Sequence, residues 1–171
     1  MNNLVSRVKA TGLLQGDFTL RSGRKAKYYL DVKKSFGDPR LLNDLADSLY
    51  ELMRELKPTC VVAYGFGGQP IADVMASRHV ELKLTRIRDS LKNYGTGRQI
   101  EGYEPNSFDR VIIPDDVFTT GSSLKDATKI IQPTGAQIVS YGVIVNREEG
   151  DPSSLSAPLV WLMTAREVMK S

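Results

Sequence analysis

Two adjacent acids followed by a cluster of hydroxyl residues and glycine are the clearest chemical signal in the sequence. Asp115 and Asp116 end an apolar run that begins at Val111, and residues 119–123 read Thr-Thr-Gly-Ser-Ser. Carboxylates accept hydrogen bonds from the vicinal hydroxyls of a sugar, and free backbone N–H groups at a helix N-terminus bind phosphate. The segment therefore has the parts of a sugar-phosphate site. The alternative is a strand, a turn and a capped helix that binds nothing.

A second glycine-rich segment, Gly65-Phe66-Gly67-Gly68-Gln69-Pro70, follows the apolar run at residues 59–64. Glycine permits unusual backbone angles and the close approach of an anion, so we expect a phosphate-binding loop here and a helix from Ile71. Many connections use glycine for turning alone. Two phosphate-binding loops in one chain favour a ligand with phosphate groups at two ends.

A cation-rich segment at residues 86–100 separates two short apolar runs. It carries Arg86, Arg88, Lys92 and Arg98 among glycines and few apolar side chains. This composition predicts a polar loop, and many polar loops only connect elements. A basic loop that closes over a pyrophosphate is the alternative that gives these cations a chemical role.

Residues 16–32 form another basic segment, which also contains aromatic side chains. The pattern predicts two short strands joined by a turn at Ser22-Gly23. A solvated basic hairpin is one interpretation. In the other, the hairpin is a hood over a planar ligand, with candidate contacts at Arg21, Lys27, Tyr28 and Tyr29.

Arg147 follows a strongly β-prone run at residues 137–145. In an open α/β sheet, the residues just beyond the carboxyl ends of the strands line the ligand crevice. Arg147 is therefore well placed to bind an anionic ligand, and the alternative is an ordinary surface turn.

Apolar spacing predicts strands that alternate with helices. The expected helices cover residues 3–14, 39–56, 71–77, 124–132 and 164–170. The expected strands cover residues 59–64, 82–87, 110–114, 137–145 and 159–163, with a short returning strand near Ile100. Asp38 is expected to cap the second helix, with Pro39 at its first position. The alternation predicts an α/β fold with a mostly parallel central sheet flanked by helices. We expect one domain, residues 1–171, with a small N-terminal hood at about residues 1–35.

Composition restricts the class of protein. The 171 residues, of which 41% are hydrophobic and 25% charged, suit one globular domain. No apolar run approaches the ~18–20 residues that span a bilayer, and the N-terminus lacks the apolar core of a signal peptide. The single cysteine, Cys60, suits a buried thiol in a reducing cytoplasm, and the single histidine, His79, argues against a zinc site. The net charge of +3 fits anionic small-molecule ligands, so neither a membrane nor a nucleic acid is expected as a partner.

Four motifs spread along the chain resemble those of type I phosphoribosyltransferases, and three of them point to the family that uses orotate. Residues 111–123 resemble the signature that binds phosphoribosyl pyrophosphate. Residues 16–24 resemble the hood motif of orotate phosphoribosyltransferases, and residues 92–97 resemble their catalytic loop in its tyrosine form. Residues 146–148 resemble the position whose arginine holds the orotate carboxylate. The resemblance covers nearly the whole chain.

Three positions depart from the family pattern. Pro114 stands in the signature strand where an apolar residue is usual. The catalytic loop begins with Arg88-Asp89 in place of an Arg-Lys pair, which removes one cation. The segment 65–68 has no lysine, unlike bacterial members, so backbone N–H groups would hold the pyrophosphate there.

The resemblance implies an enzyme that transfers the phosphoribosyl group of phosphoribosyl pyrophosphate to orotate, giving orotidine 5′-monophosphate and pyrophosphate in UMP biosynthesis. It implies Mg²⁺ held mainly by the substrate, so no side chain is assigned as a metal ligand. It also implies a homodimer with shared active sites. Whether the chain associates with orotidine-monophosphate decarboxylase stays open.

The resemblance also implies a role for each site residue. The catalytic residues would be Lys92, Arg88, Asp115 and Asp116. Ribose and the 5′-phosphate would be bound by Asp115, Asp116, Thr119, Thr120, Gly121, Ser122 and Ser123. Pyrophosphate would be bound by Gly65, Phe66, Gly67, Gly68, Arg88, Lys92 and Tyr94, and orotate by Arg21, Lys27, Tyr28, Tyr29 and Arg147.

Two other functions fit parts of the sequence. A purine phosphoribosyltransferase shares the ribose-phosphate signature, but the hood motif and Arg147 argue against it. A non-catalytic, ligand-sensing regulator on the same fold is allowed by the Asp89 departure. However, no segment large enough for a helix-turn-helix precedes the hood.

Overall fold

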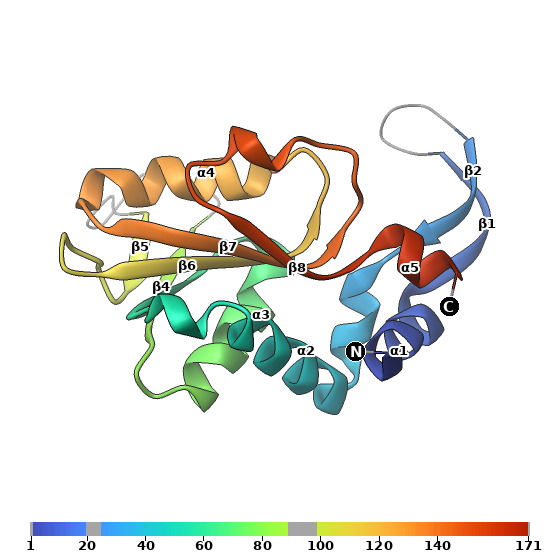
Figure 1. The fold of residues 1–171 in the computed structure, drawn as a ribbon, viewed down its shortest axis with the longest axis horizontal. Coiled ribbons are helices and arrows are strands. Elements are labelled where there is room, and N and C mark those ends of the chain that lie inside the picture. The colour runs from blue at the N-terminus through green and yellow to red at the C-terminus, as the bar shows by residue number, and fades with distance from the viewer. Residues whose placement is uncertain (1, 20–24, 89–98, 171) are drawn as a thin grey trace.

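The computed structural model describes residues 2–19, 25–88 and 99–170 (Figure 1). Its α-helices are α1 (Asn2–Gly12), α2 (Pro39–Glu51), α3 (Gly65–Arg78), α4 (Ser122–Ile131) and α5 (Ala165–Lys170). Its strands are β1 (Leu13–Thr19), β2 (Lys25–Leu30), β3 (Cys60–Ala63), β4 (Lys83–Ile87), β5 (Ile100–Gly102), β6 (Arg110–Phe118), β7 (Gln137–Asn146) and β8 (Leu159–Thr164). Short 3-10 turns are η1 (Val32–Gly37), η2 (Arg54–Leu56), η3 (Gln132–Thr134) and η4 (Pro152–Ser154).

A six-stranded sheet in the order β5-β4-β3-β6-β7-β8 forms the centre of the molecule. All neighbouring strands are parallel except the pair β4 and β5, which is antiparallel. Helices α2 and α3 cover one face of this sheet and α4 covers the other (Figure 1). The expected α/β fold with a mostly parallel, helix-flanked sheet is therefore confirmed.

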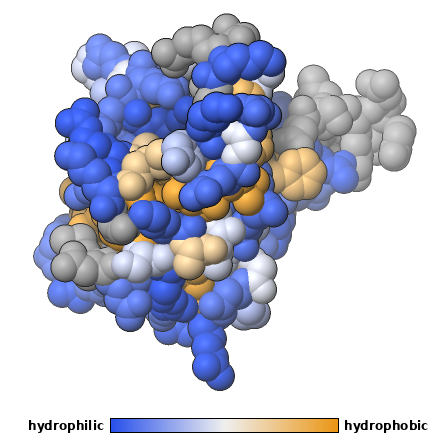
Figure 2. All heavy atoms as spheres, turned by 90° about the vertical axis from the view of Figure 1, so that its right-hand side faces the viewer, coloured by the Kyte–Doolittle hydropathy of each residue, from blue (hydrophilic) through white to orange (hydrophobic). Residues whose placement is uncertain are grey.

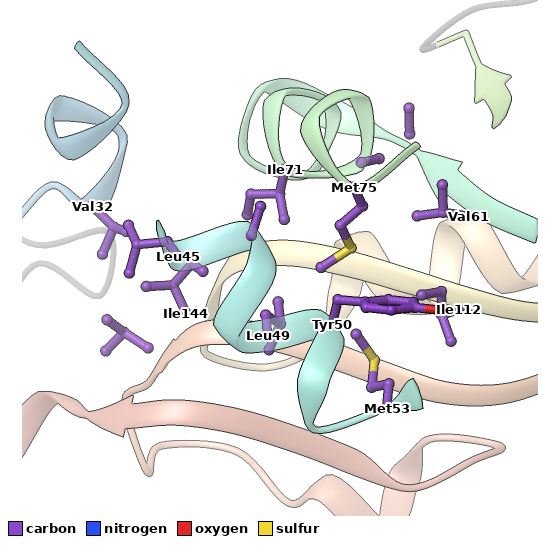
Figure 3. Packing of buried hydrophobic residues seen from close by; sticks show 14 of the residues in the cluster. Val32, Leu45, Leu49, Tyr50, Met53, Val61, Ile71, Met75, Ile112 and Ile144 are labelled. Atoms are coloured by element: carbon purple, nitrogen blue, oxygen red, sulfur yellow. The ribbon is translucent and has the colours of Figure 1, made fainter. Parts of the chain in front are cut away.

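Alternating side chains of the buried strands supply two hydrophobic clusters, one on each face of the sheet. On one face, Leu45, Leu49 and Met53 from the α2 segment and Ile71 and Met75 of α3 pack against β6 and β7 (Figure 3). On the other face, α4 packs over the remaining strand residues. Because both faces are covered, the central strands are apolar almost throughout, as in other parallel sheets.

Cys60 lies at the start of β3, fully buried and free. Burial raises the pKa of its thiol to about 11, so the reactive thiolate is scarce at neutral pH. The prediction of a buried structural thiol is confirmed.

Helix α2 begins as expected but ends five residues early. The Asp38 carboxylate accepts a hydrogen bond from the Arg40 N–H, and Pro39 occupies the first turn. The apolar spacing predicted a helix to residue 56, but α2 ends at Glu51 and η2 follows. Of the apolar residues that suggested the extension, Met53 is buried in the core although it lies outside the helix, whereas Leu52 and Leu56 are exposed.

The N-terminal segment forms its own two-stranded antiparallel sheet, β1 and β2, as predicted. This hairpin projects away from the central sheet (Figure 1). Figure 2 looks at the side from which the hairpin projects and shows apolar side chains in the middle of a mostly hydrophilic face. The turn η1 ties the hairpin to the body, because Val32 is buried in the main core and Ser35 Oγ lies 2.7 Å from Thr11 Oγ1.

Strand β6 is longer than the sequence predicted. It runs from Arg110 through the two acids to Phe118, so the acid pair lies inside the strand rather than beyond its end. Pairing with β7 continues to Phe118 and supports this extension. Pairing with β3, in contrast, stops at Ile112, although β3 itself continues to Ala63 and pairs there with β4.

The early end of the β3 pairing explains why strand β6 tolerates Pro114. The Arg110 carbonyl accepts a hydrogen bond from Thr59 on the β3 side, and strand alternation directs Pro114 to this same side. The Pro114 carbonyl lies there against Gly68 of α3. Since no β3 residue pairs at this level, the proline removes no donor that the ladder needs.

In the described parts of the chain, no helix is both long and apolar enough to cross a membrane.

Candidate functional site

The carboxyl ends of four neighbouring strands meet at one edge of the sheet, and candidate residues follow each strand. Arg88 follows β4, the glycine-rich segment follows β3, the hydroxyl cluster at 119–123 follows β6, and Arg147 follows β7. Helix α3 leaves this edge on one face of the sheet and α4 leaves on the other (Figure 1). This is the arrangement that creates a ligand crevice in open α/β sheets.

The acid pair lies buried at the centre of this edge. Asp115 is 9% exposed and Asp116 is 8% exposed. The backbone N–H of Asp116 donates a hydrogen bond to Asp115 Oδ1 at 2.8 Å, which orients the first carboxyl group. Burial, and next the neighbouring Asp116 carboxylate, raise the pKa of Asp115 well above its usual value. The pair therefore combines one carboxyl group that favours its neutral form with a second carboxylate beside it.

The glycine-rich segment is the first part of helix α3, so the predicted loop conformation is wrong, while the predicted pyrophosphate binding stays a prediction. The helix begins at Gly65, whose φ of 63° favours glycine, and it continues through Pro70 to Arg78. A Cβ atom on Gly67 would overlap the Oδ1 atoms of both acids. The glycines therefore allow the first turn of the helix to lie directly on the acid pair. That contact between distant segments could not be read from local sequence.

The N-terminus of α3 can still bind an anion. The residue before it, Tyr64, gives the first turn no side-chain cap, so backbone N–H groups of this turn lack that partner. The positive end of the helix dipole points the same way. The anion-binding role of this segment stays a prediction, and the group that would fill it is a helix end rather than a loop.

The hydroxyl cluster connects β6 to a second helix N-terminus. Gly121 precedes α4 with a φ of 73°, and a Cβ atom there would lie 2.7 Å from a ring carbon of Phe118. Glycine is therefore required at this turn. Thr120, Ser122 and Ser123 are exposed beside the first turn of α4. Their hydroxyl groups and the backbone N–H groups of the helix are donors of the kind that bind phosphate.

Arg147 lies next to the turn between β6 and α4. Its backbone N–H donates a hydrogen bond to the Phe118 carbonyl at 3.0 Å. A Cβ atom on Gly150 would overlap the Thr119 carbonyl, so the turn after β7 packs closely on residues 119–120. The Arg147 guanidinium pairs with Glu149 at 2.8 Å. An incoming ligand carboxylate would compete with Glu149 for this cation.

Lys33 is a site residue that the sequence did not reveal. Its Nζ atom lies 3.1 Å from Asp116 Oδ2 and 3.7 Å from Asp31 Oδ1. Burial lowers the pKa of the Lys33 ammonium, but the Asp116 carboxylate outweighs this effect and the pKa lies above its ordinary value. The only sequence signal was a pair of lysines directly after the second hood strand. Its partner is 83 positions away, so the contact depends on the fold.

The other predicted residues divide into two groups. Lys27 pairs with Asp17 across the hairpin, Tyr28 and Tyr29 are exposed on β2, and Arg88 lies 3.6 Å from Glu101. These contacts do not involve the acid pair. The substrate roles of these four residues stay predictions. Arg21, Lys92 and Tyr94 lie outside the described residues.

In the described part of the chain, no group of three or more His, Cys, Asp or Glu side chains is arranged to hold a metal ion. The acid pair offers oxygen ligands of the type that Mg²⁺ prefers. Two adjacent carboxylates suit a metal that brings most of its ligands with a phosphorylated substrate.

The sheet order, the acid pair and the glycine turn before α4 together define the class of protein as a type I phosphoribosyltransferase. A solved orotate phosphoribosyltransferase from Aeropyrum pernix has this fold, with a TM-score of 0.83 and 29% sequence identity over 99% of this chain and 97% of that chain. No protein-family model matches the chain.

Sequence relatives narrow the class further. The chain is 37% identical to an orotate phosphoribosyltransferase of Methanosarcina acetivorans, over 98% of this chain and 90% of the relative. It is 39% identical to one of Pyrococcus furiosus, over 79% of this chain and 74% of the relative. The chain belongs to the orotate phosphoribosyltransferase family.

Proposed function

We propose that this protein transfers the phosphoribosyl group of phosphoribosyl pyrophosphate to orotate. The products are orotidine 5′-monophosphate and pyrophosphate, on the route to UMP. The observation that carries the proposal is the buried acid pair, which lies between two helix N-termini in a chain of the orotate phosphoribosyltransferase family. A ribose carrying phosphate groups at two ends matches this sequence of acceptor and donor groups.

The acid pair binds the ribose ring in this proposal. Asp115 and Asp116 hydrogen-bond to its vicinal hydroxyl groups, and residues 119–123 bind the 5′-phosphate at the start of α4. The two subsites are joined by the last residues of β6, whose pairing with β7 holds them in place. A rigid connection of this kind fixes the position of the anomeric carbon, which lowers the entropic cost of reaction.

The pyrophosphate leaves from the α3 side of the site. As the bond between ribose and pyrophosphate breaks, positive charge grows on the sugar and negative charge on the leaving group. The N-terminus of α3, Arg88, Lys92 and Tyr94 stabilise the departing pyrophosphate electrostatically. No covalent intermediate with the protein is part of this mechanism.

Orotate enters opposite the leaving group. Arg147 binds its carboxylate in place of Glu149, and the hood residues Arg21, Lys27, Tyr28 and Tyr29 contact the planar ring. Arginine matches a carboxylate with two parallel hydrogen bonds, which would favour orotate over bases that lack one.

The proposal includes a metal, a second subunit and a location. Mg²⁺ would enter with the pyrophosphate and neutralise part of its charge. The protein would act in the cytoplasm as a homodimer, in which the segment around Lys92 serves the active site of the neighbouring subunit. The apolar side chains in Figure 2 offer surface for the contact between the two subunits. Orotidine-monophosphate decarboxylase, which would consume the product, is a candidate partner.

The activity is tested by mixing protein, Mg²⁺, phosphoribosyl pyrophosphate and orotate, and by following the loss of orotate absorbance. We expect turnover with the wild-type protein and none with the Asp115→Asn plus Asp116→Asn double variant. Calorimetry should show that this variant no longer binds phosphoribosyl pyrophosphate.

The same assay separates the competing functions. Turnover with adenine, guanine or xanthine but not orotate would identify a purine enzyme. Binding of phosphoribosyl pyrophosphate without loss of orotate at any protein concentration would identify a sensor, and either result would overturn the proposal.

A further inference from the structure

Lys33 joins the N-terminal segment to the acid pair. It lies in η1, directly after the hood strand β2, and its ammonium group reaches Asp116 of β6 at 3.1 Å. The backbone on both sides is anchored, because Val32 and Ser35 are fully buried. The Lys33 side chain is 49% exposed, so an anchored backbone carries a side chain whose ammonium group faces the site.

Asp116 needs a positive partner at this position. Its side chain is 11% exposed and adjoins the Asp115 carboxyl group, while α3 places the backbone of Gly67 against both carboxyl groups. Two neighbouring carboxyl groups in a poorly hydrated place repel each other when both are charged. The Lys33 ammonium is the group on the described residues that faces Asp116 with the opposite charge.

A second acid holds Lys33 from the other side. Asp31 Oδ1 lies 3.7 Å from Lys33 Nζ and is buried without a hydrogen-bond partner among the described residues. Lys33 therefore lies between two carboxylates, that of Asp31 on its own segment and that of Asp116 on β6. Asp31 attracts the Lys33 ammonium as well. Lys33 can therefore turn partly away from Asp116 and still have a carboxylate beside its positive charge.

We propose that Lys33 is a positioning residue for the ribose: its ion pair holds the Asp116 carboxyl group in the orientation in which the acid pair can accept the ribose hydroxyl groups. This inference rests on the proposed function, since it assigns the acid pair to ribose. It also gives the hood segment a role at the ribose subsite in addition to its predicted contact with orotate. Removal of the lysine should weaken binding of phosphoribosyl pyrophosphate more than binding of orotate.

The test compares three single variants. Lys33→Ala removes the ammonium, Lys33→Arg retains a positive charge at the same place, and Lys34→Ala removes the exposed neighbouring lysine as the matched control. For each protein, steady-state assays give the two KM values, and calorimetry with Mg²⁺ and phosphoribosyl pyrophosphate alone gives its Kd. Thermal melting reports whether the fold is retained.

We expect Lys33→Ala to raise the KM and Kd for phosphoribosyl pyrophosphate about tenfold or more, because a buried carboxylate loses its charged partner. The KM for orotate should stay within about twofold, Lys33→Arg should recover most of the loss, and Lys34→Ala should match the wild type. Equal rises in both KM values, or an arginine variant as defective as the alanine variant, would overturn the positioning role. An unchanged Kd in Lys33→Ala would also overturn it.

This outcome is separable from failure of the proposed function. If the wild-type protein binds phosphoribosyl pyrophosphate but does not consume orotate, the proposed reaction fails, while the calorimetric comparison still decides the role of Lys33. If orotate is consumed and Lys33→Ala behaves as the wild type, the reaction stands and the role of Lys33 fails.

Discussion

At the scale of single residues, the acid pair shows a conflict between stability and function. A buried carboxyl group beside another one is poorly solvated, and the raised pKa of Asp115 expresses this cost. Asp116 is compensated by Lys33, whereas the bond that orients Asp115 comes from the Asp116 backbone N–H. Functional sites often retain such unfavourable groups because the chemistry requires them.

This conflict predicts that Asp115→Asn makes the protein more stable while it lowers activity. The folded-state pKa of Asp115 lies above the unfolded value. At neutral pH folding therefore costs free energy, because the acid must either take up a proton or be buried in its charged form. The penalty is absent below the unfolded pKa of about 4 and grows as the pH rises toward the folded pKa. We expect a gain of about 1 kcal/mol in the free energy of unfolding at pH 7.5 and almost none at pH 4.

Urea denaturation at the two pH values measures this difference. Asp126→Asn, which changes an exposed acid on α4, is the matched control and should give no such pH-dependent gain. A loss of stability in Asp115→Asn at pH 7.5 would contradict the account of the acid pair.

At the scale of elements, the site depends on how closely helix α3 approaches strand β6. Gly67 and Gly68 have no side chains between the helix and the strand, and the early end of the β3 pairing leaves room for the helix to begin there. The position of the helix N-terminus, and with it the proposed pyrophosphate subsite, follows from this packing.

The close packing predicts that Gly67→Ala damages the site. The added methyl group would overlap both carboxyl groups, so α3 or the acids must move, at a cost of about 1–3 kcal/mol. We expect a lower melting temperature and a higher KM for phosphoribosyl pyrophosphate. Gly37→Ala is the control, since nothing lies within 4 Å of a Cβ atom built there. Wild-type melting and KM in Gly67→Ala would show that the close contact is not required.

At the scale of the whole molecule, distant segments share one edge of the sheet. The carboxyl ends of β4, β3, β6 and β7 are adjacent in space although they span residues 63–146 of the sequence. The hairpin forms a separate sheet that projects from this body, and η1 ties it to the core through the buried Val32 (Figure 1). The proposed function adds a second subunit to this site.

A shared site predicts that two inactive variants rescue each other. Lys92→Ala alone should lower turnover more than tenfold with the fold intact, since the leaving group loses a cation. Mixed with the Asp115→Asn plus Asp116→Asn double variant and allowed to exchange subunits, it should recover about a quarter of wild-type activity. Half of the dimers then carry one site with both functions intact.

Orotate consumption by the mixture is the measurement, and each variant alone is its control. No recovery after verified subunit exchange would show that Lys92 serves the site of its own subunit.

The sequence by itself determined the order of elements, the parallel sheet and the main donor and acceptor groups. Those features follow from local periodicity and from the polar residues that come directly after the predicted strands, as Arg147 and residues 119–123 illustrate. The tertiary structure alone decided that Gly65–Gly68 begin a helix, that Pro114 lies where β3 no longer pairs with β6, and that Lys33 meets Asp116. Each of these depends on contacts between residues far apart in the chain, and such contacts leave no periodic signal in the local sequence.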